Sequence, residues 1–127
     1  MNKYLIQAEN IKKYFYHKNG LIKLFENINF KIKKGELVAL IGPSGSGKSS
    51  LLHILALLDN PTSGKVLLKD KETKNLTNEK KDILIKENIS MIFQDNNLLG
   101  DFTALENVLL PLIIRNESYK SSEKKAL

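Results

Sequence analysis

The segment that most constrains this chain is residues 42–49, which read Gly-Pro-Ser-Gly-Ser-Gly-Lys-Ser. They match the phosphate-binding loop pattern G-x-x-x-x-G-K-[S/T] at every fixed position. An apolar run at residues 37–41 precedes them and predicts a buried strand, and residues 51–58 follow with apolar side chains at helical spacing. This motif works between a strand and a helix, so the sequence predicts an α/β fold with a site for ATP or GTP.

Each residue type in the motif has a chemical reason to be there. Gly42, Gly45 and Gly47 are expected to turn the backbone through positive φ, so that successive N–H groups converge on phosphate oxygens. Lys48 adds a cation that can reach the terminal phosphates, and the Ser49 hydroxyl is a suitable ligand for Mg²⁺. A glycine-rich turn with an incidental lysine is the alternative, and the complete match disfavours it. The predicted nucleotide-binding residues of this region are Gly42, Pro43, Ser44, Gly45, Ser46, Gly47, Lys48, Ser49 and Ser50.

Composition limits the remaining possibilities. The chain has 127 residues, enough for one modest domain, and has no cysteine for disulfides or thiolate metal sites. It starts without a signal-peptide core, and its longest apolar stretch, residues 108–114, contains a proline and is too short to cross a bilayer. The net charge of +6 comes from scattered lysines, which indicates a solvated surface and no nucleic-acid partner. These features favour a soluble, cytoplasmic protein.

The segments around the loop predict further elements. Two extended regions precede it and are joined by a hairpin turn at residues 18–20. In chain order the expected elements are strands at residues 4–9, 21–32 and 65–69, a polar helix at 78–88 and a second buried strand at 89–93.

A capping box predicts where the next helix begins. Thr103 and Glu106 have the spacing at which each side chain can bond the backbone N–H of the other residue. Apolar residues then recur on one face, and Pro111 is expected to kink or end this helix. Residues 121–127 read as the opening turns of another helix.

The order of these segments resembles the ATP-binding subunit of ABC transporters. About forty residues that read as β precede the phosphate loop, and the strand at residues 89–93 leads into Gln94. Residues 58–64, Leu-Asp-Asn-Pro-Thr-Ser-Gly, and 98–108, Leu-Leu-Gly-Asp-Phe-Thr-Ala-Leu-Glu-Asn-Val, look most like the lipoprotein-releasing branch, close to the macrolide-export and cell-division ATPases. The resemblance covers residues 3–127.

This resemblance implies a fold and a division of the chain. The expected fold is a P-loop NTPase core of the ABC type with an N-terminal antiparallel β subdomain. Residues 1–95 would hold that subdomain and the core, and residues 96–127 would start a helical subdomain.

The resemblance also assigns roles to single residues. In this family an aromatic side chain ahead of the first hairpin turn stacks on adenine, and the matching position is Phe15, with a tyrosine on either side. Gln94 matches the glutamine that contacts Mg²⁺ or the attacking water and couples ATP to the membrane subunit. Lys48 and Gln94 are therefore the expected catalytic residues, and Ser49 and Gln94 the expected metal ligands. Core packing of Phe15 and an ordinary polar role for Gln94 are the alternatives.

Three motifs of the family do not occur in the chain: the Leu-Ser-Gly-Gly signature, an apolar run ending in Asp-Glu, and a later switch histidine. In full-length relatives these motifs lie beyond the position of residue 127. The resemblance therefore implies the N-terminal half of such an ATPase, which by itself would bind Mg-ATP without turning it over.

The implied cofactors are ATP and Mg²⁺. The implied partners are a second ATP-binding subunit and integral membrane transporter subunits, at the cytoplasmic face of the inner membrane. Two alternatives stay open at this point: a nucleotide-binding remnant without turnover, and another P-loop kinase or GTPase. The long β lead and the lack of an Asn-Lys-x-Asp motif disfavour the kinase or GTPase.

Overall fold

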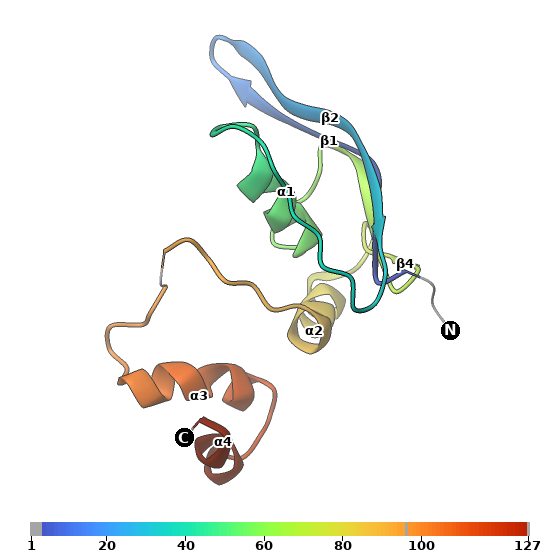
Figure 1. The fold of residues 1–127 in the computed structure, drawn as a ribbon. Coiled ribbons are helices and arrows are strands. Elements are labelled where there is room, and N and C mark those ends of the chain that lie inside the picture. Colours follow the sequence, from blue (N-terminus) through green and yellow to red (C-terminus); the bar gives the residue numbers. More distant parts are fainter. Residues whose placement is uncertain (1–3, 96, 127) are drawn as a thin grey trace. The chain divides into compact units, whose positions relative to one another are not determined.

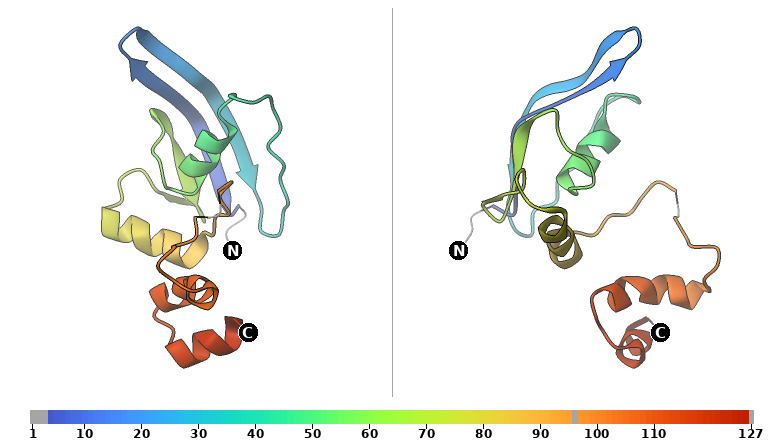
Figure 2. Two further views of the ribbon diagram at one scale, coloured as in Figure 1. Left: turned by 90° about the vertical axis from the view of Figure 1, so that its left-hand side faces the viewer. Right: turned by 180° about the vertical axis from the view of Figure 1, so that it is seen from behind.

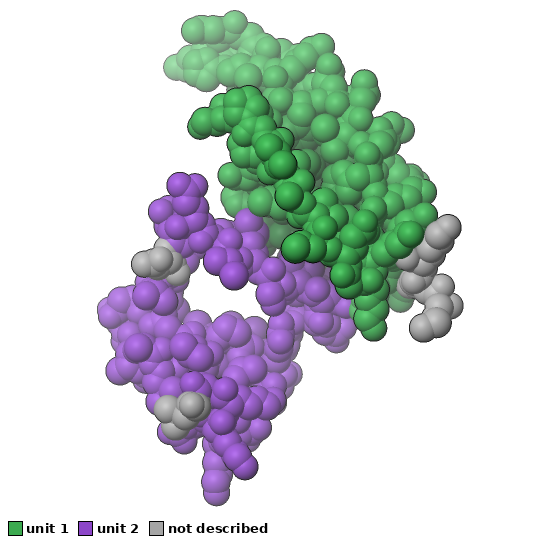
Figure 3. Space-filling view, viewed as in Figure 1, with its two compact units in different colours: residues 1–81 green, residues 82–127 purple. Residues whose placement is uncertain are grey.

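The computed structural model of the chain describes residues 4–95 and 97–126. The chain divides into two compact units, Met1–Lys81 and Asp82–Leu127 (Figure 3). The division expected from the resemblance, between residues 95 and 96, stays a prediction.

The first unit contains an antiparallel sheet with the strand order β2-β1-β3-β4. One helix, α1 (Lys48–Leu55), runs along one face of this sheet (Figures 1 and 2). The strands are β1 (Ile6–His17), β2 (Gly20–Ile32), β3 (Ser63–Leu68) and β4 (Lys71–Glu72). Strands were expected in all three regions that β1, β2 and β3 occupy, although β1 runs eight residues beyond the predicted end at residue 9, to His17.

The long hairpin of β1 and β2 closes in a two-residue loop. His17 lies opposite Gly20, so Lys18 and Asn19 form the loop. Gly20 has φ of 126°, a value that a residue with a side chain rarely adopts. The hairpin turn predicted at residues 18–20 is confirmed.

The hairpin does not pair regularly along its length. The register between β1 and β2 shifts at three places between Ala8 and Tyr14. Asn10 and Asn27, with φ of 50° and 56°, take up left-handed conformations in this part of the ladder. Bulges of this kind bend a strand and increase its twist, and the hairpin is visibly curved in Figure 1.

The core of the first unit lies between the sheet and α1. Ile11 of β1 and Ile54 of α1 have no exposed surface. Burial of such side chains stabilises each by roughly 1.5–3 kcal/mol relative to exposure. The buried apolar residues of this unit are Ala8, Ile11, Leu51, Ile54, Ala56, Leu57, Val66 and Leu68.

The helix α2 (Asn78–Asn88) begins in the first unit and ends in the second, and its bounds are those predicted from the sequence. The second unit also holds α3 (Ala104–Ile114) and α4 (Tyr119–Ala126), which pack against each other. Leu109 and Ser122 have no exposed surface.

The capping box at the start of α3 is confirmed. The backbone N–H of Thr103 donates to Glu106 Oε2 at 2.7 Å, and the backbone N–H of Glu106 donates to Thr103 Oγ1 at 3.3 Å. The helix continues past Pro111 to Ile114, so the proline does not end it.

Two predicted strands are not formed. Residues 37–41 and 89–93 have no strand structure, and none of the described residues pairs with them. Leu37 is 99% exposed and Ile92 is fully exposed, although both were expected to be buried. A buried parallel strand exists only with neighbours on its edges and layers on its faces, and an apolar sequence alone does not supply them. These two predictions were wrong for this chain.

Candidate nucleotide-binding site

The predicted phosphate loop leads directly into α1. Lys48 is the first residue of the helix, and its side chain reaches back across the loop. The ammonium group donates to the carbonyl oxygen of Gly42 at 2.9 Å and to that of Pro43 at 2.6 Å. Two backbone carbonyls thus hold the cation inside the loop that the sequence predicts will bind phosphate.

The start of α1 adds to the positive character of this place. The first N–H groups of a helix have no partners within it, and the helix N-terminus carries a partial positive charge. The first turn of α1 has no acidic residue. The loop, the ammonium of Lys48 and the helix terminus therefore form an environment that favours an anion.

Glycine is required at Gly47 for two separate reasons. Its φ of 90° is left-handed, and a Cβ there would lie 2.7 Å from Leu24 Cγ and 2.8 Å from Phe25 Cδ1. The loop therefore packs directly against β2. Gly45 also has positive φ, at 78°, but Gly42 does not, which corrects the expectation for that residue. A Cβ on Gly42 would approach Ser46 Oγ at 3.0 Å, so close packing within the loop, not handedness, favours glycine there.

Phe15 lies on β1 opposite Ile22 of β2, and its side chain is 45% exposed. The ammonium of Lys13 lies over its ring, 5.3 Å from the centroid. This exposure argues against an ordinary core residue. The ring lies on the same face of the hairpin as Lys13 and is partly open to solvent.

The neighbouring tyrosine points the other way. The Tyr14 hydroxyl donates to Glu26, and this hydrogen bond raises the pKa of the tyrosine and lowers the pKa of the glutamate. The ammonium of Lys23 lies 5.9 Å from the Tyr14 ring centroid. Successive side chains of a strand point to opposite faces, so Tyr14 lies on the face of β1 opposite to Phe15. The assignment of base stacking to Phe15 stays a prediction.

An ion pair that was not predicted from the sequence lies next to Phe15. Lys13 Nζ is 2.6 Å from Asp59 Oδ2 and donates to the carbonyl oxygen of Asn60 at 2.9 Å. Burial acts to raise the pKa of Asp59, but hydrogen bonds from Lys13 and from the Asn60 N–H hold it below its ordinary value. The sequence did contain a sign that Lys13 needs a partner: it lies two residues after the buried Ile11, on the strand face that the two-residue period assigns to the core.

Gln94 and Asp95 belong to the second unit and are exposed. The role of Gln94 as a metal ligand and catalytic residue stays a prediction.

Ser49 is the residue of the first unit whose hydroxyl was predicted to bind Mg²⁺. It is exposed in the first turn of α1. Within residues 4–95 and 97–126, no group of His, Cys, Asp or Glu side chains is arranged to hold a metal ion. Mg²⁺ accepts few protein ligands when phosphate oxygens and water supply the rest, so a hydroxyl at this position fits the ion.

Two hollows of the first unit lie at different ends of α1. The smaller, of about 180 Å³, borders the phosphate loop. Its lining is Phe25, Ile28, Leu40, Ile41, Ser46, Gly47, Lys48 and Leu51.

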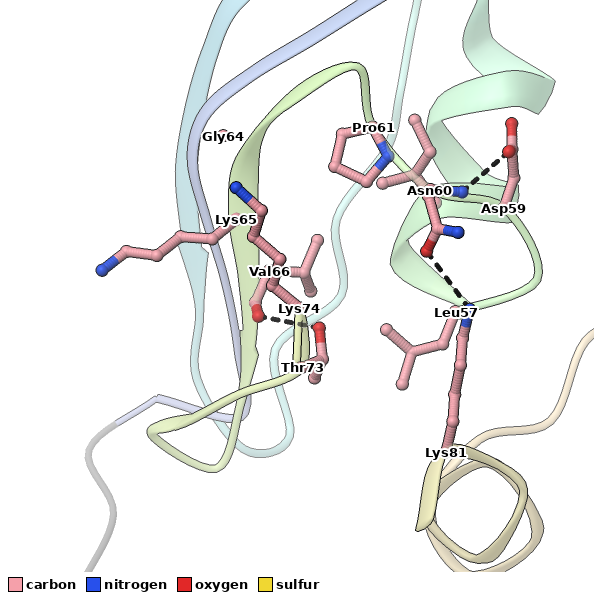
Figure 4. Close-up of a pocket in the computed structure, with 11 residues that line it drawn as sticks. Leu57, Asp59, Asn60, Pro61, Gly64, Lys65, Val66, Thr73, Lys74 and Lys81 are labelled. Carbon is pink, nitrogen blue, oxygen red and sulfur yellow. Dashed lines mark hydrogen bonds between the residues drawn. The ribbon is translucent and has the colours of Figure 1, made fainter. Parts of the chain in front are cut away.

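The other hollow, of about 240 Å³, lies beyond the end of α1 (Figure 4). Lys81 Nζ donates to Asn60 Oδ1 at 3.3 Å across it, and Thr73 Oγ1 donates to the carbonyl oxygen of Val66 at 2.9 Å at its wall. None of residues 42–49 lines it, so it is separate from the phosphate loop.

In the part of the chain that the structure describes, no helix has both the length and the apolar character needed to cross a membrane.

Comparisons with known proteins agree with this geometry. The sequence profile of the ABC transporter family matches residues 25–127. The lipoprotein-releasing system ATP-binding protein LolD of Ehrlichia canis is 48% identical over 93% of this chain and 52% of its own length. LolD of Rickettsia bellii is 41% identical over 99% of this chain and 55% of its own length. The chain thus spans about half the length of the curated relatives it matches.

Solved structures are similar as well. A dimeric structure of the ATP-binding cassette MJ0796 in a post-hydrolysis state, bound to ADP and Pi, matches with a TM-score of 0.89 and 37% identity. The match covers 95% of this chain and 53% of that one. A second dimeric structure of MJ0796, described as a bacterial ABC transporter cassette, matches with a TM-score of 0.88 and 38% identity, over 94% of this chain and 53% of that one.

Proposed function

Because the chain belongs to the ABC transporter family and has the fold of about half a cassette, we propose that it grips the phosphates of Mg-ATP for a transport ATPase. The observation that carries the proposal is the position of Lys48. Its ammonium is held by the carbonyl groups of Gly42 and Pro43 at the start of α1. This is where a triphosphate must lie to meet the loop N–H groups, the cation and the helix terminus together.

The remaining predicted residues have consistent roles in this proposal. The N–H groups of Gly42 and residues 44–50 bind the phosphates, since Pro43 has no N–H to donate. Ser49 binds Mg²⁺, and Phe15 stacks on the base. Gln94 would contact Mg²⁺ or the attacking water and couple ATP to the membrane subunit. Phosphoryl transfer is catalysed mainly by positioning and by electrostatic stabilisation, and Lys48 supplies both at the terminal phosphates.

The transported material is proposed from the relatives. Those matched in Ehrlichia canis and Rickettsia bellii are named lipoprotein-releasing system ATP-binding proteins. We therefore propose that this chain contributes to ATP-driven release of lipoproteins from the inner membrane. Its partners would be a second ATP-binding subunit and integral membrane subunits, at the cytoplasmic face. The matched MJ0796 structures are dimers, which supports the first of these partners.

A second candidate function is nucleotide binding without turnover. The phosphate loop is complete, whereas the 127 residues contain neither the Leu-Ser-Gly-Gly signature nor an apolar run ending in Asp-Glu. In the family these segments supply the second side of the closed site and the general base. Binding and hydrolysis are therefore tested separately.

Binding is tested by calorimetry with adenylyl imidodiphosphate, an ATP analogue that resists hydrolysis, in the presence of Mg²⁺. Lys48→Ala is expected to weaken binding by at least about tenfold, because it removes a charged donor facing the phosphates. The control is Lys34→Ala, which removes the same charge from an exposed turn. Equal affinities for all three proteins would overturn the assignment of the phosphate site.

A further inference from the structure

Lys13 is an unusual lysine because it is only 8% exposed. Burying an ammonium is costly unless it is paired and hydrogen-bonded. Lys13 meets this requirement with two contacts, to Asp59 Oδ2 at 2.6 Å and to the carbonyl oxygen of Asn60 at 2.9 Å. Both partners belong to the segment that follows α1, so the end of that helix fixes where the ammonium lies.

These contacts hold the Lys13 ammonium over the aromatic ring of Phe15. Lys13 Nζ lies 5.3 Å from the ring centroid of Phe15, within the distance at which a cation is attracted to the negative face of the ring. Phe15 is nevertheless 45% exposed, so the cation does not enclose it. One side of the ring is occupied by a fixed charge, and part of its surface remains open.

From this geometry we propose that Lys13 is a positioning residue for base recognition: it holds the Phe15 ring from one side and presents the other side to a purine. The inference rests on the proposed function, since Phe15 meets a base only when a nucleotide occupies the phosphate loop. The attraction restrains the ring, so less conformational freedom is lost on stacking. The cation also draws the π electrons towards itself, which leaves the open face less negative and better suited to an electron-rich purine.

The same contacts connect base recognition to the phosphate loop. α1 begins at Lys48 in the loop and is followed by the partners of Lys13, Asp59 and Asn60. A helix of eight residues is about 12 Å long. The helix thus joins the phosphate site at its start to the segment beyond its end that holds Lys13 and, through Lys13, the ring that receives the base.

A purely structural role for Lys13 would give a different result. In that case its loss would weaken the attachment of β1 to residues 59–60, and every ligand of the loop would lose affinity alike. A positioning role acts only on ligands that carry a base. The test therefore compares adenylyl imidodiphosphate with inorganic tripolyphosphate, each with Mg²⁺, by calorimetry on the full chain.

Lys13→Met keeps most of the side-chain stem and removes the charge. It is expected to lower the affinity for the ATP analogue about three- to tenfold, while the affinity for tripolyphosphate changes less than about twofold. The matched control is Lys65→Met, which removes a lysine of the same sheet that pairs with Glu9 at 3.3 Å. This control is expected to change neither affinity. In a Phe15→Ala background, Lys13→Met is expected to have no further effect on the ATP analogue.

Lys13→Met leaves the Asp59 carboxylate without its cation and can prevent folding. In that case the double variant Lys13→Met/Asp59→Leu, which replaces the ion pair with an apolar pair, is measured with the same two ligands. Equal losses for both ligands, or no loss for the ATP analogue, would overturn the positioning role. Failure of the wild-type chain to bind either ligand would overturn the proposed function, and this inference with it. The two failures are therefore distinguishable.

Discussion

Gly64 of β3 lies directly against the backbone of Asn10 in β1: a Cβ on Gly64 would be 2.3 Å from the Asn10 carbonyl oxygen and 2.6 Å from its carbon. The two residues stand where the register between β1 and β3 shifts, and both have positive φ, 89° for Gly64 and 50° for Asn10. The bulge of one strand fits into the space left by the missing side chain of the other. This contact lets β3 follow the curvature of the hairpin.

Gly64→Ala is therefore expected to destabilise the first unit by about 2–4 kcal/mol, from backbone overlap and from the unfavourable left-handed conformation together. Chemical denaturation with a strand-sensitive signal measures the change. The control is Gly35→Ala, which has a similar φ of 78° but no atom within 4 Å of the new Cβ. If the two variants lose equal stability, the left-handed backbone conformation alone explains the need for glycine at position 64, and the overlap with Asn10 does not contribute.

The buried hydroxyl of Ser122 gives a prediction for the second unit. Ser122 has no exposed surface, and its Oγ has no hydrogen-bond partner within the described residues. Removal of an unsatisfied buried hydroxyl is expected to be neutral or to stabilise the α3–α4 pair, by up to about 1 kcal/mol. Thermal unfolding of Ser122→Ala tests this, with the exposed Ser121→Ala as control. A clear loss of stability in Ser122→Ala alone would mean that the hydroxyl has a partner in solution.

The capping box predicts a pH dependence. The carboxylate of Glu106 accepts hydrogen bonds from the backbone N–H and the hydroxyl of Thr103, and these lower its pKa from the ordinary 4.5. A group whose pKa is lower when folded contributes stability above its unfolded pKa. That contribution is lost as the pH falls from 4.5 through the folded value.

An NMR titration of the Glu106 carboxyl carbon is expected to show a midpoint below that of an unstructured glutamate. Glu106→Gln keeps an acceptor but removes the titrating group, so α3 should lose this pH dependence. A midpoint at or above 4.5 would mean that the capping box does not persist in solution.

The unpaired segment at residues 37–41 gives a prediction about local opening. Its N–H groups take part in no strand ladder, so they are expected to exchange with solvent much faster than those of Ala8 and Ile11, which lie in the sheet. Amide hydrogen exchange measures both groups in one experiment. Comparable protection in a monomer would show that this segment pairs in solution after all.

ATP turnover by the chain alone is expected to be negligible. A closed site and a positioned general base each contribute factors of about 10² or more. The corresponding motifs do not occur in its 127 residues. Phosphate release is measured with wild type and Lys48→Ala purified in parallel. A rate near 1 s⁻¹, within the usual range for enzymes, that disappears in Lys48→Ala would contradict this expectation.

The sequence predicted well those features that depend on nearby residues. The hairpin turn at Lys18 and Asn19, the bounds of α2 and the capping box of Thr103 are set by local chemistry, and all three are confirmed. The α/β fold class and the ABC family were also inferred correctly, because the phosphate loop and the segments around it carry specific motifs.

Features that depend on distant residues were predicted poorly. The runs at residues 37–41 and 89–93 have strand-like composition, but a strand needs partners, and local sequence does not report them. The ion pair of Lys13 with Asp59 joins residues 46 positions apart. The strand period could indicate that Lys13 faces the core, but no local pattern could indicate which residue pairs with it. In the candidate site, the phosphate loop could be located from its sequence motif. The residues that surround Phe15 could not be predicted from the sequence, because they come together only in the folded structure.

The hold of Gly42 and Pro43 on the Lys48 ammonium has a consequence for the thermodynamics of binding. A free lysine side chain has about 2 kcal/mol of rotamer entropy, most of which is lost when it is fixed against a ligand. In this loop the side chain is already ordered by two carbonyl groups, and an ammonium has one further N–H for a phosphate oxygen. Much of the entropic cost of ordering the lysine is thus met during folding, so an incoming phosphate gains its charged hydrogen bond with little loss of side-chain freedom.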